Sequence, residues 1–169
     1  MSNESKSKTV SLRRVIIVAL AAFAAILAFA APASAAAPKF HSATSSVNNA
    51  GSLVVNFDER GLGNTNIDYT LAADATAVYA CINGGGNHPQ ATNKETVNAE
   101  VTAAGSFEPK NGRVVASLSA GPPSAGAFSC PPGQRLVLAS VSYTNIVLTD
   151  TTNGVSTSVA DASRTFFAV

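Results

Sequence analysis

Apolar and polar residues alternate with a period of two along most of the chain beyond residue 50, and helical periodicity is nearly absent. In the segment 53–58, Leu53, Val55 and Phe57 fall on one side of an extended chain. In the segment 96–104, four apolar residues alternate with polar ones in the same way. Successive side chains of a strand point to opposite faces, so this period predicts half-buried β-strands.

Turn residues separate these strands, chiefly Gly, Pro and Asn, as in the pair Asn111-Gly112. The predicted strands cover residues 53–58, 67–71, 75–82, 96–104, 113–119, 134–150, 155–160 and 164–169. Short strands at this spacing predict an all-β chain that folds as a two-sheet antiparallel sandwich of immunoglobulin-like style, with about eight strands. A small closed β-barrel is the alternative.

The beginning of the chain has a different pattern, typical of an export signal. Four basic residues precede an uninterrupted apolar run over residues 15–31, and Ala33-Ser34-Ala35 supplies the small residues that signal peptidase requires. We predict a helical signal peptide over residues 1–35 and a single secreted domain over residues 36–169. Cleavage after Ala37 and an uncleaved anchor are the alternatives.

The route of export is predicted to be general secretion. Arg13-Arg14 is followed by none of the further residues of a twin-arginine signal.

Removal of the signal changes the charge of the protein. It would take away four of the eleven basic residues and one of the ten acidic residues, which leaves seven against nine and a formal charge of −2. A domain of this charge without a basic stripe is a poor partner for nucleic acid. We expect an extracellular monomer that does not contact a membrane after cleavage, binds no cofactor, and meets a glycan, a protein or a small ligand.

Two cysteines, Cys81 and Cys130, lie in the exported part of the chain. An even number of cysteines in an oxidising compartment predicts a disulfide between them. Closing a loop of this length stabilises a fold by about 4 kcal/mol on the chain-entropy model. A redox or zinc-binding role is not favoured, because a Cys-x-x-Cys motif and paired ligand spacing are both missing from the sequence.

No diagnostic catalytic motif occurs in the sequence. His41 or His88 could serve a serine as the base of a hydrolase, but a nucleophile elbow followed by a helix is not present. Asp58 and Glu59 are adjacent, so on a regular strand they point to opposite faces and cannot act as a carboxylate pair. We therefore predict no catalytic residues, and keep a secreted hydrolase that uses His88 as the second hypothesis.

Metal binding has one weak candidate. Asn64, Asn66 and Asp68 alternate and could present three oxygen ligands for calcium on one side of the chain. Asn and Asp at the ends of loops more often cap turns, so no metal site is predicted.

One composite surface is the best candidate for binding. A disulfide between Cys81 and Cys130 would bring the loop that follows Cys81 next to the Pro/Gly-rich loop before Cys130. We predict that a rim forms there at one end of the sandwich from Asn87, His88, Lys94 and Phe128.

The stretch CINGGGNHPQATNK, followed downstream by SCPPGQRLVLASVSYTNIVLTDT, resembles small secreted bacterial proteins with a Cys-x-Asn-Gly-Gly-Asn-x-Pro loop and a later Cys-Pro strand. This chain has one extra glycine in the loop. The resemblance implies export, a β-sandwich and a bridge between Cys81 and Cys130, but no substrate. We expect a non-enzymatic binding or structural module at the cell surface or in the medium; a small inhibitor or ligand carrier is the third hypothesis.

Overall fold

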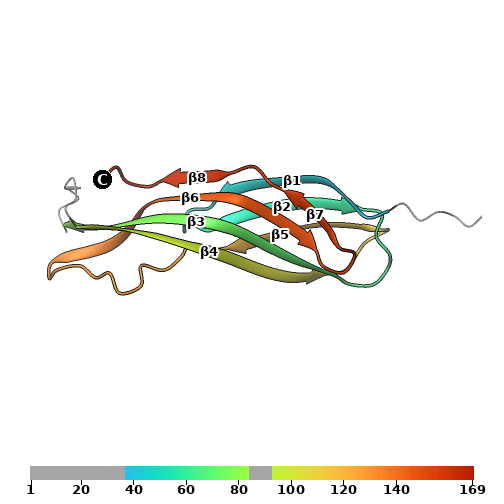
Figure 1. Cartoon of the computed structure of the whole chain (residues 1–169), viewed down its shortest axis with the longest axis horizontal. Helices are drawn as coiled ribbons and strands as arrows, with labels where there is room; N and C mark the ends of the chain where they lie inside the picture. The colour runs from blue at the N-terminus through green and yellow to red at the C-terminus, as the bar shows by residue number, and fades with distance from the viewer. Residues whose placement is uncertain (1–36, 84–92) are drawn as a thin grey trace, which may run out of the picture. The chain divides into compact units, whose positions relative to one another are not determined.

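The computed structural model describes residues 37–83 and 93–169, which form eight β-strands in two open antiparallel sheets (Figure 1). The smaller sheet has the order β1-β2-β5, and the larger sheet has the order β4-β3-β6-β7, with β8 also paired to β6. The strands are β1 (Lys39–Val47), β2 (Leu53–Arg60), β3 (Ile67–Asn83), β4 (Lys94–Phe107), β5 (Arg113–Ala120), β6 (Gln134–Asp150), β7 (Val155–Ser158) and β8 (Ala162–Thr165).

The predicted all-β sandwich is confirmed, and its two sheets do not close into the barrel that was the alternative. The predicted bounds of β6 are those of the structure. The strands predicted over 67–71 and 75–82 are in fact one 17-residue strand, β3. Its middle residues, Ala72 to Asp74, stay in the sheet because β4 pairs with them continuously, while a bulge against β6 absorbs the irregular register.

Two predictions at the ends of the domain were wrong. The first strand, β1, was not predicted, since its sequence KFHSATSSV is largely polar. The last strand, β8, ends at Thr165, so Phe166 lies beyond the ladder, where its backbone amide donates to the carbonyl of Ala139. Among the described residues there is no helix, and therefore none that could span a membrane.

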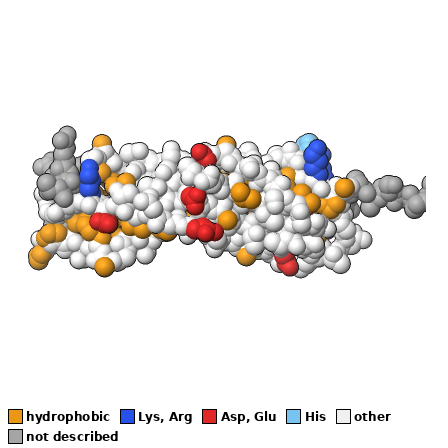
Figure 2. All heavy atoms as spheres, in the orientation of Figure 1, with side chains coloured by type: hydrophobic (Ala, Val, Ile, Leu, Met, Phe, Trp, Pro, Cys, Tyr) orange, Lys and Arg blue, Asp and Glu red, His pale blue; other side chains and the backbone are white. Residues whose placement is uncertain are grey.

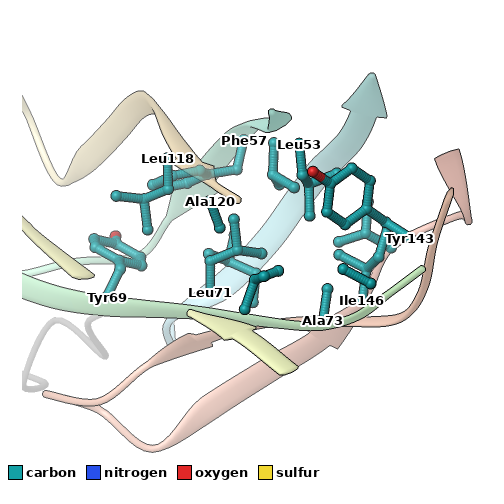
Figure 3. Packing of buried hydrophobic residues seen from close by; sticks show 14 of the residues in the cluster. Leu53, Phe57, Tyr69, Leu71, Ala73, Leu118, Ala120, Tyr143 and Ile146 are labelled. Carbon is teal, nitrogen blue, oxygen red and sulfur yellow. The ribbon is translucent and has the colours of Figure 1, made fainter. Parts of the chain in front are cut away.

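Inward-facing residues of both sheets form one hydrophobic core (Figure 3). The alternation seen in the sequence accounts for it: Leu53, Val55 and Phe57 of β2 face Tyr69 and Leu71 of β3, and all five are at most 2% exposed. β5 and β6 complete the core with Leu118, Ala120, Tyr143, Ile146 and Leu148. Burial of apolar side chains on this scale supplies most of the driving force for folding.

Two tyrosines of the core also hold loops in place. The hydroxyl of Tyr143 is buried and donates to the carbonyl of Gly51, 2.6 Å away, in the turn between β1 and β2. The hydroxyl of Tyr79 donates to the carbonyl of Pro123, at 2.6 Å, in the loop between β5 and β6. Each hydrogen bond fixes a loop between two strands to a strand of the larger sheet.

We expect Tyr143→Phe to lower the free energy of unfolding by about 1–2 kcal/mol, because the buried carbonyl of Gly51 would lose its donor. Urea unfolding followed by fluorescence measures this change. Tyr79→Phe is the matched control: its hydrogen bond is only part-buried, because the Tyr79 side chain is half-buried, so its effect should be smaller. Equal stability of wild type and Tyr143→Phe would contradict the assigned hydrogen bond.

Candidate functional site

A row of basic side chains crosses one end of the smaller sheet. Lys39 of β1 pairs with Arg60 of β2, and Arg60 pairs with Arg113 of β5. Residues directly opposite each other in antiparallel strands share a face, and neighbouring strands lie about 4.8 Å apart. The three residues, which are far apart in the sequence, therefore line up across the strands; we call them the cationic row.

Asp58 fixes the two arginines of the row. Its carboxylate accepts from Nε and Nη2 of Arg113 at 2.8 and 2.9 Å and from Nη2 of Arg60 at 2.8 Å. The two guanidinium groups cover Asp58 almost completely, yet each arginine side chain remains 49% exposed. Hydrogen bonds first from Arg113 and then from Arg60 hold the pKa of Asp58 well below its usual range, and Asp58 raises the pKa of Arg113.

Two surface pockets adjoin the cationic row. One, of about 380 Å³, is lined by the described residues Ala37, Lys39, Phe40, His41, Arg60 and Gly61. The other, of about 330 Å³, is lined by Phe107, Glu108, Lys110, Arg113, Val114 and Val115. Figure 2 shows basic side chains gathered beside the histidine, near the start of β1. Both pockets are at the small end of the volumes found for ligand sites.

The apolar walls of these pockets belong to one aromatic cluster. Phe40 of the first pocket and Phe107 of the second both pack edge-on against Phe57, with ring centroids 6.2 and 6.0 Å away. Phe57 in turn lies 4.7 Å from Tyr69 in the core. Such interlocked rings hold the pocket walls in fixed positions.

The interior below the cationic row holds an unusual group of polar side chains. Glu59 points into the sandwich, is fully buried, and neither of its carboxyl oxygens has a hydrogen bond of good geometry to a described residue. The Tyr69 hydroxyl and the buried carboxylate of Asp150 are the polar groups that act on it. Burial raises the pKa of Glu59, the Asp150 carboxylate raises it further, and the Tyr69 hydroxyl opposes both.

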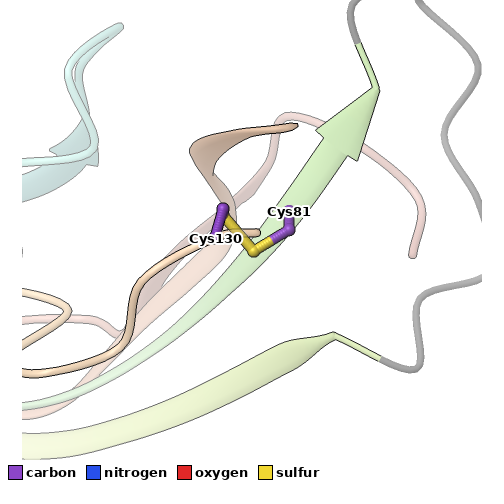
Figure 4. Close-up of a disulfide and its surroundings, with 2 residues drawn as sticks. All are labelled: Cys81 and Cys130. Carbon is purple, nitrogen blue, oxygen red and sulfur yellow. A yellow bond between two sulfur atoms is a disulfide. The ribbon is translucent and has the colours of Figure 1, made fainter. Parts of the chain in front are cut away.

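The predicted disulfide is confirmed. Cys81, near the end of β3, is bonded to Cys130 in the loop before β6, with the two Cα atoms 5.5 Å apart (Figure 4). This bridge is compatible with an extracellular location. It lies at the opposite end of the sandwich from the cationic row, because the ladder from β3 to β4 runs from Ile67↔Phe107 at one end to Ala80↔Lys94 at the other.

The predicted rim is only partly described. Asn87 and His88 lie outside the described residues, as do residues 1–36, which include the predicted signal peptide. Lys94 is exposed at the start of β4, and Phe128 is half-buried in the loop that carries Cys130, where its backbone amide donates to the carbonyl of Ala125.

The other candidate residues are not brought together as a metal or catalytic site within the described residues. Asn64 and Asn66 are exposed in the connection before β3, and the carbonyl of Asp68 accepts from the amide and hydroxyl of Thr151. No group of three or more His, Cys, Asp or Glu in 37–83 and 93–169 is placed to hold a metal ion. The carboxylate of Asp58 is bonded to the two arginines.

Comparison with protein-family models, with curated proteins and with solved structures finds no match. The function must therefore be inferred from the geometry of the site.

The cationic row was missed by sequence reasoning, which expected a domain without a basic stripe. Lys39, Arg60 and Arg113 are separated by more than twenty residues each, so only the strand register places them together. The one available signal was that Arg60 follows the predicted strand 53–58 by two residues and Arg113 begins the predicted strand 113–119.

Proposed function

We propose that this protein is an exported, disulfide-stabilised, non-enzymatic module that binds an extracellular partner through exposed groups at the ends of its sandwich. The observation that carries the proposal is the cationic row: two arginines held in place by Asp58, half exposed, next to two pockets with rigid walls. A prearranged, accessible set of donors is what a binding surface requires.

The shifted ionisable groups support binding over catalysis. Burial is the first cause of the raised pKa values of Glu59, Tyr69, Tyr79 and Tyr143. The pKa of Asp58 is lowered by its hydrogen bonds with Arg113 and Arg60, and that of Arg113 is raised by its hydrogen bond with Asp58. General acid–base chemistry by a carboxyl group, a lysine or a tyrosine needs a pKa shifted towards the working pH and a position within reach of a substrate. Among the described residues, the groups with shifted values are buried in the core, belong to the ion pairs of Asp58, or, for the half-buried Tyr79, have a hydroxyl bonded to the carbonyl of Pro123.

The proposal is tested with the full chain expressed in an exporting host, and with the product purified from the medium. We expect micromolar binding to at least one class of ligand on arrays of glycans, peptides and small anions, and no turnover on a panel of hydrolase substrates. Hydrolysis that His88→Ala abolished would overturn the proposal in favour of the hydrolase hypothesis. If the protein bound no ligand on any of these arrays, the binding function would be overturned and a structural role would remain.

A further inference from the structure

We propose that the cationic row and its two pockets form a site for a carboxylate-bearing polysaccharide, which lies across strands β1, β2 and β5. This inference rests on the proposed binding function and names the ligand class. It follows from the charge, the donor geometry and the pocket walls at this end of the domain.

The surface side chains of the site carry a charge opposite to that of the whole domain. Of the seven basic residues in 36–169, four lie here, in the cationic row and at Lys110, and two carboxylates, Asp58 and Glu108, lie among them, while Glu59 and Asp150 are buried below the row. These six surface side chains sum to a formal charge of +2, whereas the domain 36–169 sums to −2. Separation of charge of this kind draws anionic ligands to one place on a surface.

The donor geometry suits carboxylates. A guanidinium presents five N–H donors in a planar fork, and Asp58 occupies Nε and Nη2 of both arginines. Nη1 of each arginine makes no hydrogen bond to a described residue and belongs to a side chain that is half exposed. Asp58 is thus a positioning residue. It orients both guanidinium groups and leaves the Nη1 donors of the two arginines available to a second, external anion.

The pocket walls suit sugar rings. Phe40 lines the pocket next to Lys39 and Arg60, and Phe107, Val114 and Val115 line the pocket next to Arg113; both rings are half-buried and packed against the core. Apolar walls of this kind can pack against the C–H face of a pyranose, and a uronic acid carries its carboxylate on the same ring. A polymer that crosses the strands can therefore place one ring in each pocket and carboxylates along the row between them.

Nucleic acid is a poorer match for the same surface. Its phosphates repeat along an extended backbone, and affinity grows with the number of phosphates that are neutralised. Four cations with two acidic neighbours, on a domain of net negative charge, provide few such contacts. The few charges and the aromatic pocket walls favour a polymer that is charged on the ring and partly apolar.

The experiment compares four soluble polymers by calorimetry with the purified exported protein: polygalacturonate, its fully methyl-esterified form, dextran and dextran sulfate. We expect binding to polygalacturonate, weakened by salt, and little binding to the methyl ester, in which the same sugar has lost its charge. Equal affinity for dextran sulfate would overturn the preference for carboxylates, since it would show attraction by charge alone.

Substitutions then locate the site. Lys39→Gln, Arg60→Gln and Arg113→Gln should each weaken binding about tenfold, the effect of one charge-assisted hydrogen bond. Arg135→Gln, which removes an exposed cation from the other end of the sandwich, is the matched control and should leave the affinity unchanged. Equal losses in the row variants and in the control would overturn the assignment to this face.

Asp58→Asn separates positioning from charge. It adds one positive charge to the site, so a mere electrostatic patch would bind the polymer more tightly. If Asp58 orients the arginines, affinity should fall instead, and a tighter complex would overturn its positioning role. Unfolding midpoints of all variants show whether they remain folded under the conditions of the titration.

The result also distinguishes this inference from the proposed function. Binding to a neutral glycan or a protein, unaffected by the row variants, would overturn the carboxylate site and leave the binding function in place. Binding to none of the polymers and none of the array ligands would overturn both.

Discussion

Replacing Cys81 and Cys130 together by alanine is expected to lower the free energy of unfolding by about 4 kcal/mol, the value of the chain-entropy model for a loop of this length. The bridge joins residues 49 positions apart. Without the bridge, the unfolded chain has more conformational entropy, which favours the unfolded state. Alanine is preferred to serine because Cys81 is 1% exposed, and a hydroxyl there would be buried.

Guanidinium chloride unfolding measures this effect, with reduction by dithiothreitol as the internal control. The reduced wild type and the double variant should unfold at similar denaturant concentrations, and the double variant should not respond to the reductant. An unchanged midpoint for the double variant would show that the bridge contributes nothing to the stability of the fold.

The second large effect is expected at Glu59, as a dependence of stability on pH. The pKa of Glu59 in the folded protein is raised above the ordinary glutamate value of 4.5, because burial disfavours the carboxylate. The protonated form is therefore the one that the fold prefers. The stability that protonated Glu59 adds to the fold is present in full below pH 4.5. It is lost as the pH rises through the raised pKa, and the free energy of unfolding then falls by up to about 1.4 kcal/mol per pH unit.

The groups around Glu59 reinforce this direction. Asp150 from β6 presents a second buried carboxylate, and Tyr69 from β3 presents a hydroxyl. Phe40 of β1 and Val114 of β5, its partners on the neighbouring strands, carry no charge. None of these neighbours carries a positive charge that would stabilise an ionised Glu59, so the fold favours the protonated form.

Glu59→Gln should remove the dependence, because the amide does not ionise. At pH 8 the variant should exceed the wild type in free energy of unfolding, and the two should converge towards pH 4. Glu100→Gln, on the exposed face of β4, is the matched control and should follow the wild type. A wild type whose stability did not fall between pH 5 and pH 8 would contradict the raised pKa.

Asp58 is expected to behave in the opposite way, although it is the next residue in the chain. Its pKa is lowered by the two arginines, so its contribution to stability is present above the ordinary aspartate value of 3.8 and is lost as the pH falls through the lowered pKa. The opposite shifts follow from the strand geometry: Asp58 faces the cationic row, and Glu59 faces the core.

Local pattern was sufficient for most of the fold and insufficient for the site. Alternation predicted β2, β4 and β6 because the apolar residues of each gather on one face, although Val101 is the one buried residue of β4, and the cysteine count predicted the bridge. Alternation failed for β1, which lies at an edge of the smaller sheet and, among the described strands, pairs with β2 alone, so few of its residues need to be apolar.

The chemistry of the site depends on contacts between distant segments. Sequence reasoning separated Asp58 and Glu59 to opposite faces correctly, but it had no means to know that Arg113 would reach Asp58 or that Asp150 would lie near Glu59. Those neighbours come from β5 and β6, and they depend on register rather than on local composition. The predicted rim remains a prediction for Asn87 and His88.

The bridge between Cys81 and Cys130 has a consequence for a protein exposed to proteases. A cut at the turn between β4 and β5, for example after Lys110, lies inside the loop that the bridge closes. Both fragments would stay covalently joined, and each would keep its place in the two sheets through its own ladders. A nicked molecule would therefore run as one species without reductant and as two with it, and could continue to bind its partner after the first cleavage.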